Sequence, residues 1–357
     1  MIFVYIGSTI LVAAFGQRIH VPVARIAVYV GLALLLSVGP VLGLGSDATL
    51  NTLADAGIFV LLALGLNIVV GFAGLLDLGY AAFFAIGAYT YAMLASPQFG
   101  VHLPFWVLLF VGAALAGAFG IILGSPTLRL RGDYLAIVTL GFGEIVPQVF
   151  QNLTRFTGGP NGIAALDFPS LFGRSFGTAA FPYYEVTLGL IGVALVTARN
   201  LRSSRIGRAW MAIREDELAA RHLGINTTRM KLAAFAIGAA FAGVGGVVYA
   251  AKLSLVSPDL FQFQVSILVL SMLVLGGMGN IAGVVIGSLV LTLVNQVILP
   301  QSNVLAQAAH LPVNLSNAHF FIYGGILVAI MLFRPEGLLP SAQRQAELHE
   351  SVQADGV

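Results

Sequence analysis

The sequence contains no cysteine and few charged residues. The absence of cysteine excludes disulfides, thiolate metal sites and cysteine catalysis. Only 9% of the 357 residues are charged, and the only lysines, Lys231 and Lys252, do not follow a glycine as the lysine of a nucleotide-binding P-loop does. Motifs of the H-E-x-x-H and G-x-S-x-G type are also missing, and the six histidines are scattered. We therefore expect no catalytic residue, no metal site and no ATPase site in this chain.

Long hydrophobic runs make up most of the chain. Hydrophobic residues account for 58% of it and the mean hydropathy is +0.95, whereas soluble domains are about 45–50% apolar. The runs are continuous rather than alternating, which excludes a porin-like barrel. Since roughly 20 apolar residues cross a bilayer as a helix, we expect an all-α, polytopic transmembrane bundle of about 10 helices. The eleven candidate spans are 2–17, 24–44, 52–70, 78–96, 104–124, 134–152, 182–199, 231–251, 264–279, 282–299 and 318–333; the first of them would alternatively lie along the membrane interface.

Basic residues are concentrated between Leu201 and Lys231. This segment holds seven of the 17 basic residues and three of the 15 acids. Basic residues accumulate on the cytoplasmic side of membrane proteins. If the 201–231 loop is cytoplasmic and the spans alternate, 14 basic residues lie inside, and only Arg155, Arg174 and Lys252 lie outside. The C-terminus is then cytoplasmic too.

The loop contains signals for two short helices. Ser204 can cap a helix over Arg205–Arg214, and Asp216 can cap a second over Glu217–Leu223, because each side-chain oxygen can accept from first-turn amides. Gly224 follows as a helix stop. The second helix is only about 10 Å long, too short to span a membrane. Its expected apolar surface, formed by Leu218, Ala219, Ala220 and Leu223, suits a groove on another protein. The alternatives are a solvated connector and a basic segment resting on anionic lipid.

Two glycine-rich segments interrupt apolar runs, at Gly71–Gly79 and at Leu275–Gly283. Interrupted helices often mark transporter sites, because a helix N-terminus and unwound carbonyls can meet a substrate. Their corresponding positions would also fit an inverted repeat. The alternative is a pair of tight turns at the membrane surface. The candidate translocation residues lie in or beside these two segments, except for Glu144, which lies within an apolar span. They are Asn67, Gly71, Gly74, Asp77, Glu144, Gly276 and Gly277.

Glu144 is the acid that lies deep within an apolar span. An unpaired charge there costs several kcal/mol, so the carboxyl must be neutral or partnered. We favour a structural role, with hydrogen bonds to Thr139, to neighbouring helices or to a residue of a second subunit. A transient contact with a substrate ammonium group is the alternative.

Long connections are expected on the outer side at 152–181 and 300–317, and long loops often carry function. The first contains T-G-G-P-N-G, whose glycines tolerate unusual backbone conformations and can offer main-chain amides to a docked partner. The candidate contact residues are Gly158, Gly159 and Asn161. A plain turn between two helices is the alternative.

Several long motifs together resemble one family. They are GLNIVVGFAGLLDLGYAAFFAIGAY (65–89), TLRLRGDYLAIVTLGFGEI (127–145), TGGPNGI (157–163), GRAWMAIREDELAARHLGI (207–225) and VLGGMGN (274–280). In order and type they resemble the branched-chain amino acid ABC transporter permeases of the LivM type, from about Asp55 to about Leu339. Within the fourth motif, the A-A-x-x-x-G pattern resembles the coupling loop of ABC importers.

This resemblance implies three regions: N-terminal transmembrane segments over 1–50, a permease domain over 51–340, and a polar cytoplasmic tail over 341–357. It also implies that the coupling loop contacts an ATPase through Arg214, Asp216, Glu217, Ala219, Ala220 and Gly224.

The implied function is import of leucine, isoleucine or valine across the bacterial cytoplasmic (inner) membrane. The implied partners are a homologous LivH-like permease, two ATP-binding subunits and a periplasmic substrate-binding protein, with membrane lipid but no nucleic acid. ATP and Mg would be bound by the ATP-binding subunits, and this chain would bind no cofactor. A related ABC permease for urea, short amides or sugars is the first alternative, and an ion-driven secondary carrier is the second.

Overall fold

A computed structural model describes residues 46–127, 133–171, 173–298, 300, 324–325, 328, 332 and 337–339. The expected spans at 2–17 and 24–44, most of the span at 318–333, the outer loop at 300–317 and the tail after 340 lie outside the described residues.

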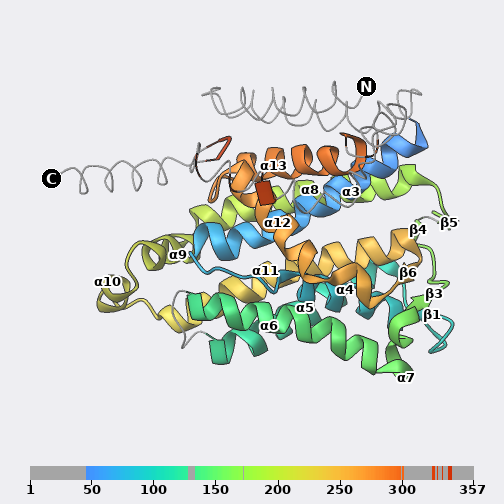
Figure 1. Ribbon diagram of the computed structural model, residues 1–357, viewed down its shortest axis with the longest axis horizontal. Helices are drawn as coiled ribbons and strands as arrows, with labels where there is room; N and C mark the ends of the chain where they lie inside the picture. The colour runs from blue at the N-terminus through green and yellow to red at the C-terminus, as the bar shows by residue number, and fades with distance from the viewer. Residues whose placement is uncertain are drawn as a thin grey trace.

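Long helices running along a common direction form the described fold (Figure 1). The helices are α3 (Asp47–Leu66), α4 (Tyr80–Leu94), α5 (Phe105–Thr127), α6 (Asp133–Asn152), α7 (Thr154–Thr157), α8 (Ala180–Ser203), α9 (Arg205–Glu215), α10 (Glu217–His222), α11 (Thr227–Leu253), α12 (Phe263–Gly276) and α13 (Ile281–Leu293). Two π-helical stretches, η1 (Asn67–Phe72) and η4 (Val294–Ile298), continue α3 and α13, and η2 (Gly159–Asn161) and η3 (Pro258–Phe261) are single 3₁₀ turns.

The predicted spans within the described ranges all coincide with helices. Seven helical segments in this part of the chain are long and apolar enough to cross a membrane, and α4 is a shorter apolar helix. Segmentation by hydropathy succeeds here because a helix is the only simple way to satisfy a single span's backbone groups in lipid. The all-α prediction is confirmed, and the chain is a multi-pass membrane protein.

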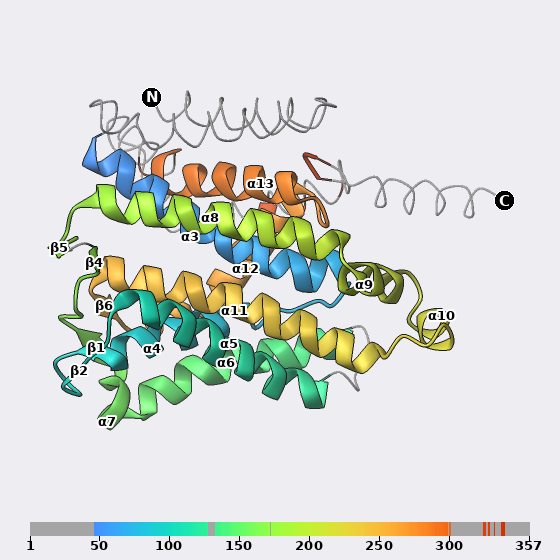
Figure 2. The ribbon, with the colours of Figure 1, turned by 180° about the vertical axis from the view of Figure 1, so that it is seen from behind.

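Helix α11 lies in the interior and packs against α3, α4 and α5. Figure 2 shows α8, α3 and α13 on one side of α11 and α4, α5 and α6 on the other. Glycines allow the close approach: a Cβ added at Gly243 would lie 2.5 Å from the Gly112 carbonyl oxygen, and one at Gly120 would lie 2.8 Å from the Phe235 carbonyl oxygen. Small residues at crossings are the usual way for helices to pack in lipid.

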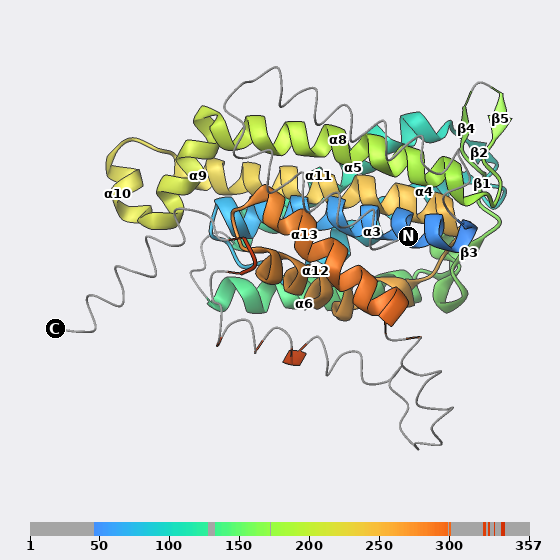
Figure 3. The same ribbon diagram turned by 90° about the horizontal axis from the view of Figure 1, so that it is seen from above.

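The two ends of the bundle differ. Helices α9 and α10 project from one end, and three short strand pairs lie at the other (Figures 1 and 3). The pairs are β1 (Ala95–Ser96) with β2 (Val101–His102), β3 (Ile163–Ala164) with β6 (Leu255–Val256), and β4 (Ser170–Leu171) with β5 (Arg174–Ser175), all antiparallel.

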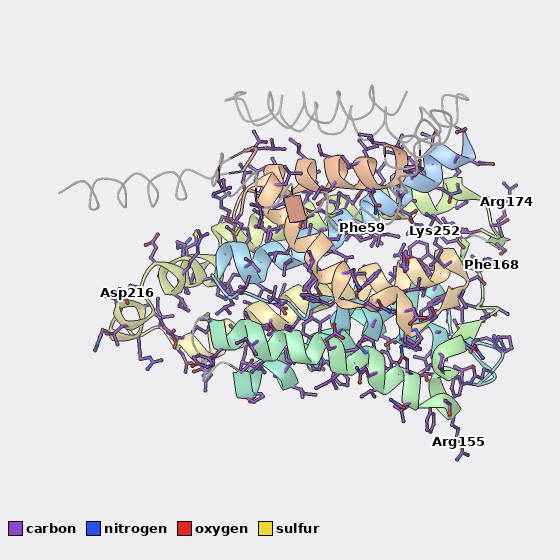
Figure 4. All side chains as sticks on the ribbon, in the orientation of Figure 1. Phe59, Arg155, Phe168, Arg174, Asp216 and Lys252 are labelled. Carbon is purple, nitrogen blue, oxygen red and sulfur yellow. The ribbon has the colours of Figure 1, made fainter. Side chains whose placement is uncertain are left out.

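The distribution of charges between these ends agrees with the predicted alternation of spans. Figure 4 places Asp216 at one end and Arg155, Arg174 and Lys252 at the opposite end. These three are the basic residues that the alternation of spans separates from the 201–231 loop.

Candidate functional site

The first glycine-rich segment interrupts a membrane crossing. Helix α3 continues into the π-helix η1, and after it residues 73–79 are non-helical until α4 begins at Tyr80. With 15 residues, α4 is only about 22 Å long, so it cannot cross a hydrocarbon core of about 30 Å alone. The 73–79 segment runs from the α9 end of the bundle to the start of α4 (Figure 1). The predicted discontinuous helix is therefore confirmed at this position.

Side chains from distant helices hold the start of α4. The amide of Leu78 donates to Thr139 Oγ1 of α6 at 3.1 Å, and the amide of Ala81 donates to Ser266 Oγ of α12 at 2.9 Å. The amide of Gly79 donates to Asp77 Oδ1 at 2.9 Å. Asp77 is buried, and its Oδ2 has no hydrogen-bond partner among the described residues. The amides of Leu78 and Gly79, which the break frees, thus find acceptors inside the protein, as irregular backbone at membrane depth requires.

The second glycine-rich segment is a tight turn, so the predicted discontinuous helix is wrong here. Helix α12 ends at Gly276, and the amide of Asn280 donates to the Gly277 carbonyl at 3.2 Å. Gly277 and Gly279 have φ values of 107° and 83°, a region that glycine adopts easily. Asn280 then caps α13 by accepting from the amides of Ala282 and Gly283. Four residues between two helices leave room for a turn only.

A hydrogen bond connects the helix before the first segment to the turn of the second segment. Asn67 Oδ1 accepts a hydrogen bond from the Gly279 amide at 2.8 Å, and both residues are buried. Gly71 lies against this bond: a Cβ there would overlap Asn67 Oδ1 and lie 2.8 Å from the Gly279 nitrogen. Asn67, Gly71, Gly276 and Gly277 are all buried within this chain, so these predicted translocation residues form a packed contact rather than an exposed lining.

The loop between α8 and α11 has the predicted local structure. Ser204 Oγ accepts from the Gly207 amide at 3.2 Å and caps α9. Asp216 Oδ1 accepts from the amides of Leu218 and Ala219, at 2.8 and 3.0 Å, and caps α10. Gly224 follows with a φ of 85°. These caps could be predicted because each joins residues only two or three positions apart.

The exposed apolar surface of α10 is smaller than the sequence predicted. Leu218 is 60% exposed and Leu223 is 81% exposed, and Ala219 is also exposed. Ala220, however, is only 2% exposed. The expectation that Ala220 is available to a partner is wrong, because it lies on the face of this short helix that turns toward the rest of the chain.

Glu217 and Trp210 attach the loop to α11. Glu217 Oε2 lies 2.7 Å from Lys231 Nζ, whose side chain is nearly buried, and Glu217 Oε1 lies 3.5 Å from Arg221 Nη2. Trp210 is fully buried, and its Nε1 donates to the Met230 carbonyl at 2.6 Å. The buried ring of Trp210 and the partly buried ion pair tie the loop to α11, so α9 and α11 are expected to move together.

Arg214 connects the loop to the interrupted helix. Its Nη1 donates to the Gly71 carbonyl at 2.5 Å, and a Cβ added at Gly74 would lie 2.7 Å from Arg214 Cγ. Gly74 has a φ of 69°, a left-handed conformation that lets the backbone pass close to the Arg214 side chain. Arg214 was expected to contact an ATPase, whereas this guanidinium binds η1, just before the non-helical 73–79 segment. The contact joins residues 143 positions apart, and the sequence near either residue does not indicate it.

Glu144 is exposed on the outer face of α6. The expected bond to Thr139 does not form: Thr139 Oγ1 donates to the Ala136 carbonyl at 3.0 Å and accepts from Leu78. One turn away, Gly141 has open space around it, and Gln148 is exposed too. This exposure excludes a role for Glu144 in joining helices within the part of the chain that the structure describes. The alternatives with a second subunit or with substrate stay predictions.

The T-G-G-P-N-G turn uses most of its amides internally. The Gly158 amide donates to the Thr154 carbonyl at 3.1 Å, and the Gly159 amide donates to Thr157 Oγ1 at 3.2 Å. Gly158 and Gly159 have φ values of 73° and 62°. The expectation that these amides are free for a partner is therefore wrong. Asn161 is exposed and remains a candidate contact.

A bundle of candidate spans, one of them interrupted and contacted by a projecting loop, defines a class of protein: a polytopic membrane protein with a discontinuous helix. Residues 48–331 match the family described as branched-chain amino acid transport system / permease component. The chain belongs to this family.

Three relatives illustrate the similarity. The chain is 42% identical over 325 residues to the high-affinity branched-chain amino acid transport system permease protein LivM of Escherichia coli, covering 85% of this chain and 72% of that protein. It is 22% identical over 320 residues to a probable LivM of Methanocaldococcus jannaschii, covering 80% and 91%. It is 28% identical over 297 residues to the permease protein LivH of Escherichia coli, covering 79% and 91%. No solved structure matches the chain.

Proposed function

We propose that this chain is the membrane-spanning permease subunit of an ABC importer that moves leucine, isoleucine or valine into the cytoplasm. The similarity to proteins named as high-affinity branched-chain amino acid permeases supports this cargo. The proposed location is the bacterial cytoplasmic membrane, with the 201–231 loop and the C-terminus in the cytoplasm. The concentration of basic residues in that loop supports this orientation.

A second, LivH-like permease completes the proposed pathway. Relatives of this chain carry both the LivM and the LivH names, which indicates a permease pair in branched-chain transport systems. The outer face of α6 is the surface proposed to face the second permease. Glu144 and Gln148 are exposed on it, and a carboxyl facing lipid at this depth would be costly. Contact with the second permease or with a water-filled pathway removes that cost.

Two ATP-binding subunits drive the proposed import, and they bind the ATP and Mg that this chain does not. Helix α10 is the proposed docking element, because Leu218, Ala219 and Leu223 are exposed on a stub that projects from the bundle. A groove on a partner that buried these side chains would gain free energy in proportion to the apolar area covered.

The contact between Arg214 and Gly71 carries the proposal. When α10 moves with an ATP-binding subunit, α9 moves with it, since only Asp216 separates the two helices. The guanidinium of Arg214 then pulls or releases the Gly71 carbonyl of η1, just before the unwound 73–79 segment begins. Asn67 passes the displacement to the α12–α13 turn through Gly279. Asn67, Gly71, Gly74, Asp77, Gly276 and Gly277 are thus proposed to set the state of the pathway rather than to touch the cargo.

A periplasmic binding protein is the proposed source of cargo. It would meet the strand end of the bundle, opposite α10, where Asn161 is exposed on the turn after α7.

The test is reconstitution of the complex: this chain, its LivH-like partner, the ATP-binding subunits and the binding protein, in proteoliposomes. Leucine, isoleucine and valine should each stimulate ATP hydrolysis, and urea and ribose should not. If only urea or only ribose stimulated ATP hydrolysis, that solute would be assigned as the cargo in place of leucine, isoleucine and valine. Ion-driven uptake by this chain alone, without ATP-binding subunits, would overturn the proposal.

A further inference from the structure

A basic hollow lies where α8 ends and α9 begins. Its volume is about 400 Å³, and it is lined by Arg199, Arg202, Ser203, Arg208 and Met211. Three of the five lining residues are arginines and none is acidic. Arg208 Nη1 donates to the Ser203 carbonyl at 2.8 Å, which holds that guanidinium beside the last residue of α8. Among the described residues, the ion pairs lie elsewhere, at His102, at Lys252, and at Glu217 with its two partners. Within the described residues, the hollow therefore has a positive charge that no acidic side chain neutralises.

An apolar stripe on α8 leads directly to this hollow. Gly189, Gly192, Val196, Arg199 and Ser203 follow one another at intervals of three or four residues, so they share one face of the helix. A Cβ added at Gly189 or Gly192 would meet nothing within 4 Å, and Val196 is 60% exposed. The stripe is a shallow apolar surface that ends at the arginines.

We propose that the hollow binds the phosphate of an anionic phospholipid whose acyl chains lie along this stripe. Guanidinium groups bind phosphate oxygens through paired, charge-assisted hydrogen bonds. Basic pockets at the membrane surface between helices are suited to lipid head groups. Free phosphate would fill the hollow but leave the stripe empty, whereas a phospholipid uses both. An acidic surface of an ATP-binding subunit would also match the charge but not an apolar stripe within a membrane span.

The inference has a structural consequence at the base of the coupling loop. Arg199, Arg202 and Ser203 belong to the last turns of α8, and Arg208 belongs to α9. A phosphate between them joins the two helices across Ser204, which is the one residue that separates them. The lipid would thereby fix the angle at which α9 leaves the membrane, independently of what the transporter carries.

The test compares spin-labelled phosphatidylglycerol with spin-labelled phosphatidylcholine on the whole purified complex in phosphatidylcholine vesicles. The fraction of immobilised label should be higher for phosphatidylglycerol on the wild type. Arg202→Gln should reduce that preference about fivefold, as expected for one basic residue near a lipid phosphate. Arg205→Gln removes the same charge from the same loop outside the hollow, and it should retain the preference. Gly192→Leu, which fills the stripe without changing charge, should reduce the preference too.

Equal preference in Arg202→Gln and Arg205→Gln would overturn the proposal, as would no preference in the wild type. Loss of the preference on adding millimolar inorganic phosphate, at an ionic strength matched with chloride, would identify a free-anion site instead. If Arg202→Gln kept its lipid preference and lost its ATP-binding subunits, the hollow would be a subunit contact. Equal size-exclusion profiles of all variants serve as the control for folding.

Discussion

The two glycine-rich segments have similar compositions but different structures. Residues 73–79 form a non-helical segment, and side chains of three other helices hold it and its two ends: Arg214 donates to Gly71 just before it, Thr139 accepts from Leu78 within it, and Ser266 accepts from Ala81 just after it. Residues 277–280 form a turn closed by a backbone hydrogen bond and by the cap that Asn280 provides. The backbone of Leu338 and Leu339 adds hydrogen bonds to the end of α12. The first segment is therefore held by side chains of other helices, whereas the second is closed by its own backbone bond and cap, to which distant residues add further contacts.

The largest effect is expected from filling the space at the first segment. Gly71→Val would push a side chain into Asn67 and the Gly279 amide, where a Cβ already overlaps. Leucine uptake by the reconstituted complex should fall to background. The matched control is Gly189→Val, a helical glycine with open space around it, which should leave uptake intact. Uptake by Gly71→Val equal to that of the control would contradict the account of this contact.

The next largest effect is expected at the end of α10. Gly224 has a φ of 85° and open space around it, so Gly224→Arg strains the helix stop by roughly 1–2 kcal/mol and places a bulky charge beside the docking surface. Leucine should no longer stimulate ATP hydrolysis, although the permease stays folded. Gly173→Arg introduces the same strain at the opposite end, at a φ of 78°, and should keep its ATP-binding subunits on purification, whereas Gly224→Arg should lose them. Normal leucine uptake by Gly224→Arg would refute docking through α10.

A moderate loss of stability is expected from removing the bond between the two segments. Asn67→Leu leaves the buried Gly279 amide without its acceptor, at a cost of about 1–3 kcal/mol. Thermal unfolding of the purified protein should shift to lower temperature, and uptake should fall with it. Asn200→Leu, at an exposed asparagine of α8, provides the comparison. A melting temperature of Asn67→Leu no lower than that of Asn200→Leu would exclude the bond as a stabilising contact.

The smallest effect is expected at the second segment. Asn280→Ala removes the cap of α13, which is worth about 1 kcal/mol at a typical N-terminus. A small drop in melting temperature should accompany nearly normal leucine uptake, because the turn keeps its backbone hydrogen bond. If Asn280→Ala abolished uptake as fully as Gly71→Val, the two segments would be functionally equivalent and the comparison would fail.

Hydropathy and local capping patterns accounted for much of the fold. The spans could be predicted because a lipid core imposes a minimum apolar length, and the caps at Ser204 and Asp216 because they join near neighbours. The difference between the two glycine-rich segments could not be predicted from glycine content. It depends on hydrogen bonds such as those that Thr139 and Ser266 accept from Leu78 and Ala81, which lie 61 and 185 positions away.

The direction in which single side chains face could not be predicted from the sequence either. Ala219 and Ala220 are identical in type, yet one is exposed and the other is buried, because a six-residue helix has no periodic pattern long enough to reveal its buried face. Glu144 was placed inside its helix bundle because charges in apolar spans usually face protein. It does face outward in this chain, and that rule then indicates a second subunit or a water-filled pathway.

The central claim is that the loop transmits ATP hydrolysis to the first segment through Arg214. The direct measurement is leucine uptake and ATP hydrolysis in the same proteoliposomes, for the wild type and for Arg214→Gln, which cannot hold the Gly71 carbonyl through a guanidinium. The account predicts that Arg214→Gln retains its ATP-binding subunits and hydrolyses ATP, but takes up far less leucine for each ATP consumed. An unchanged ratio of leucine to ATP in Arg214→Gln would contradict it.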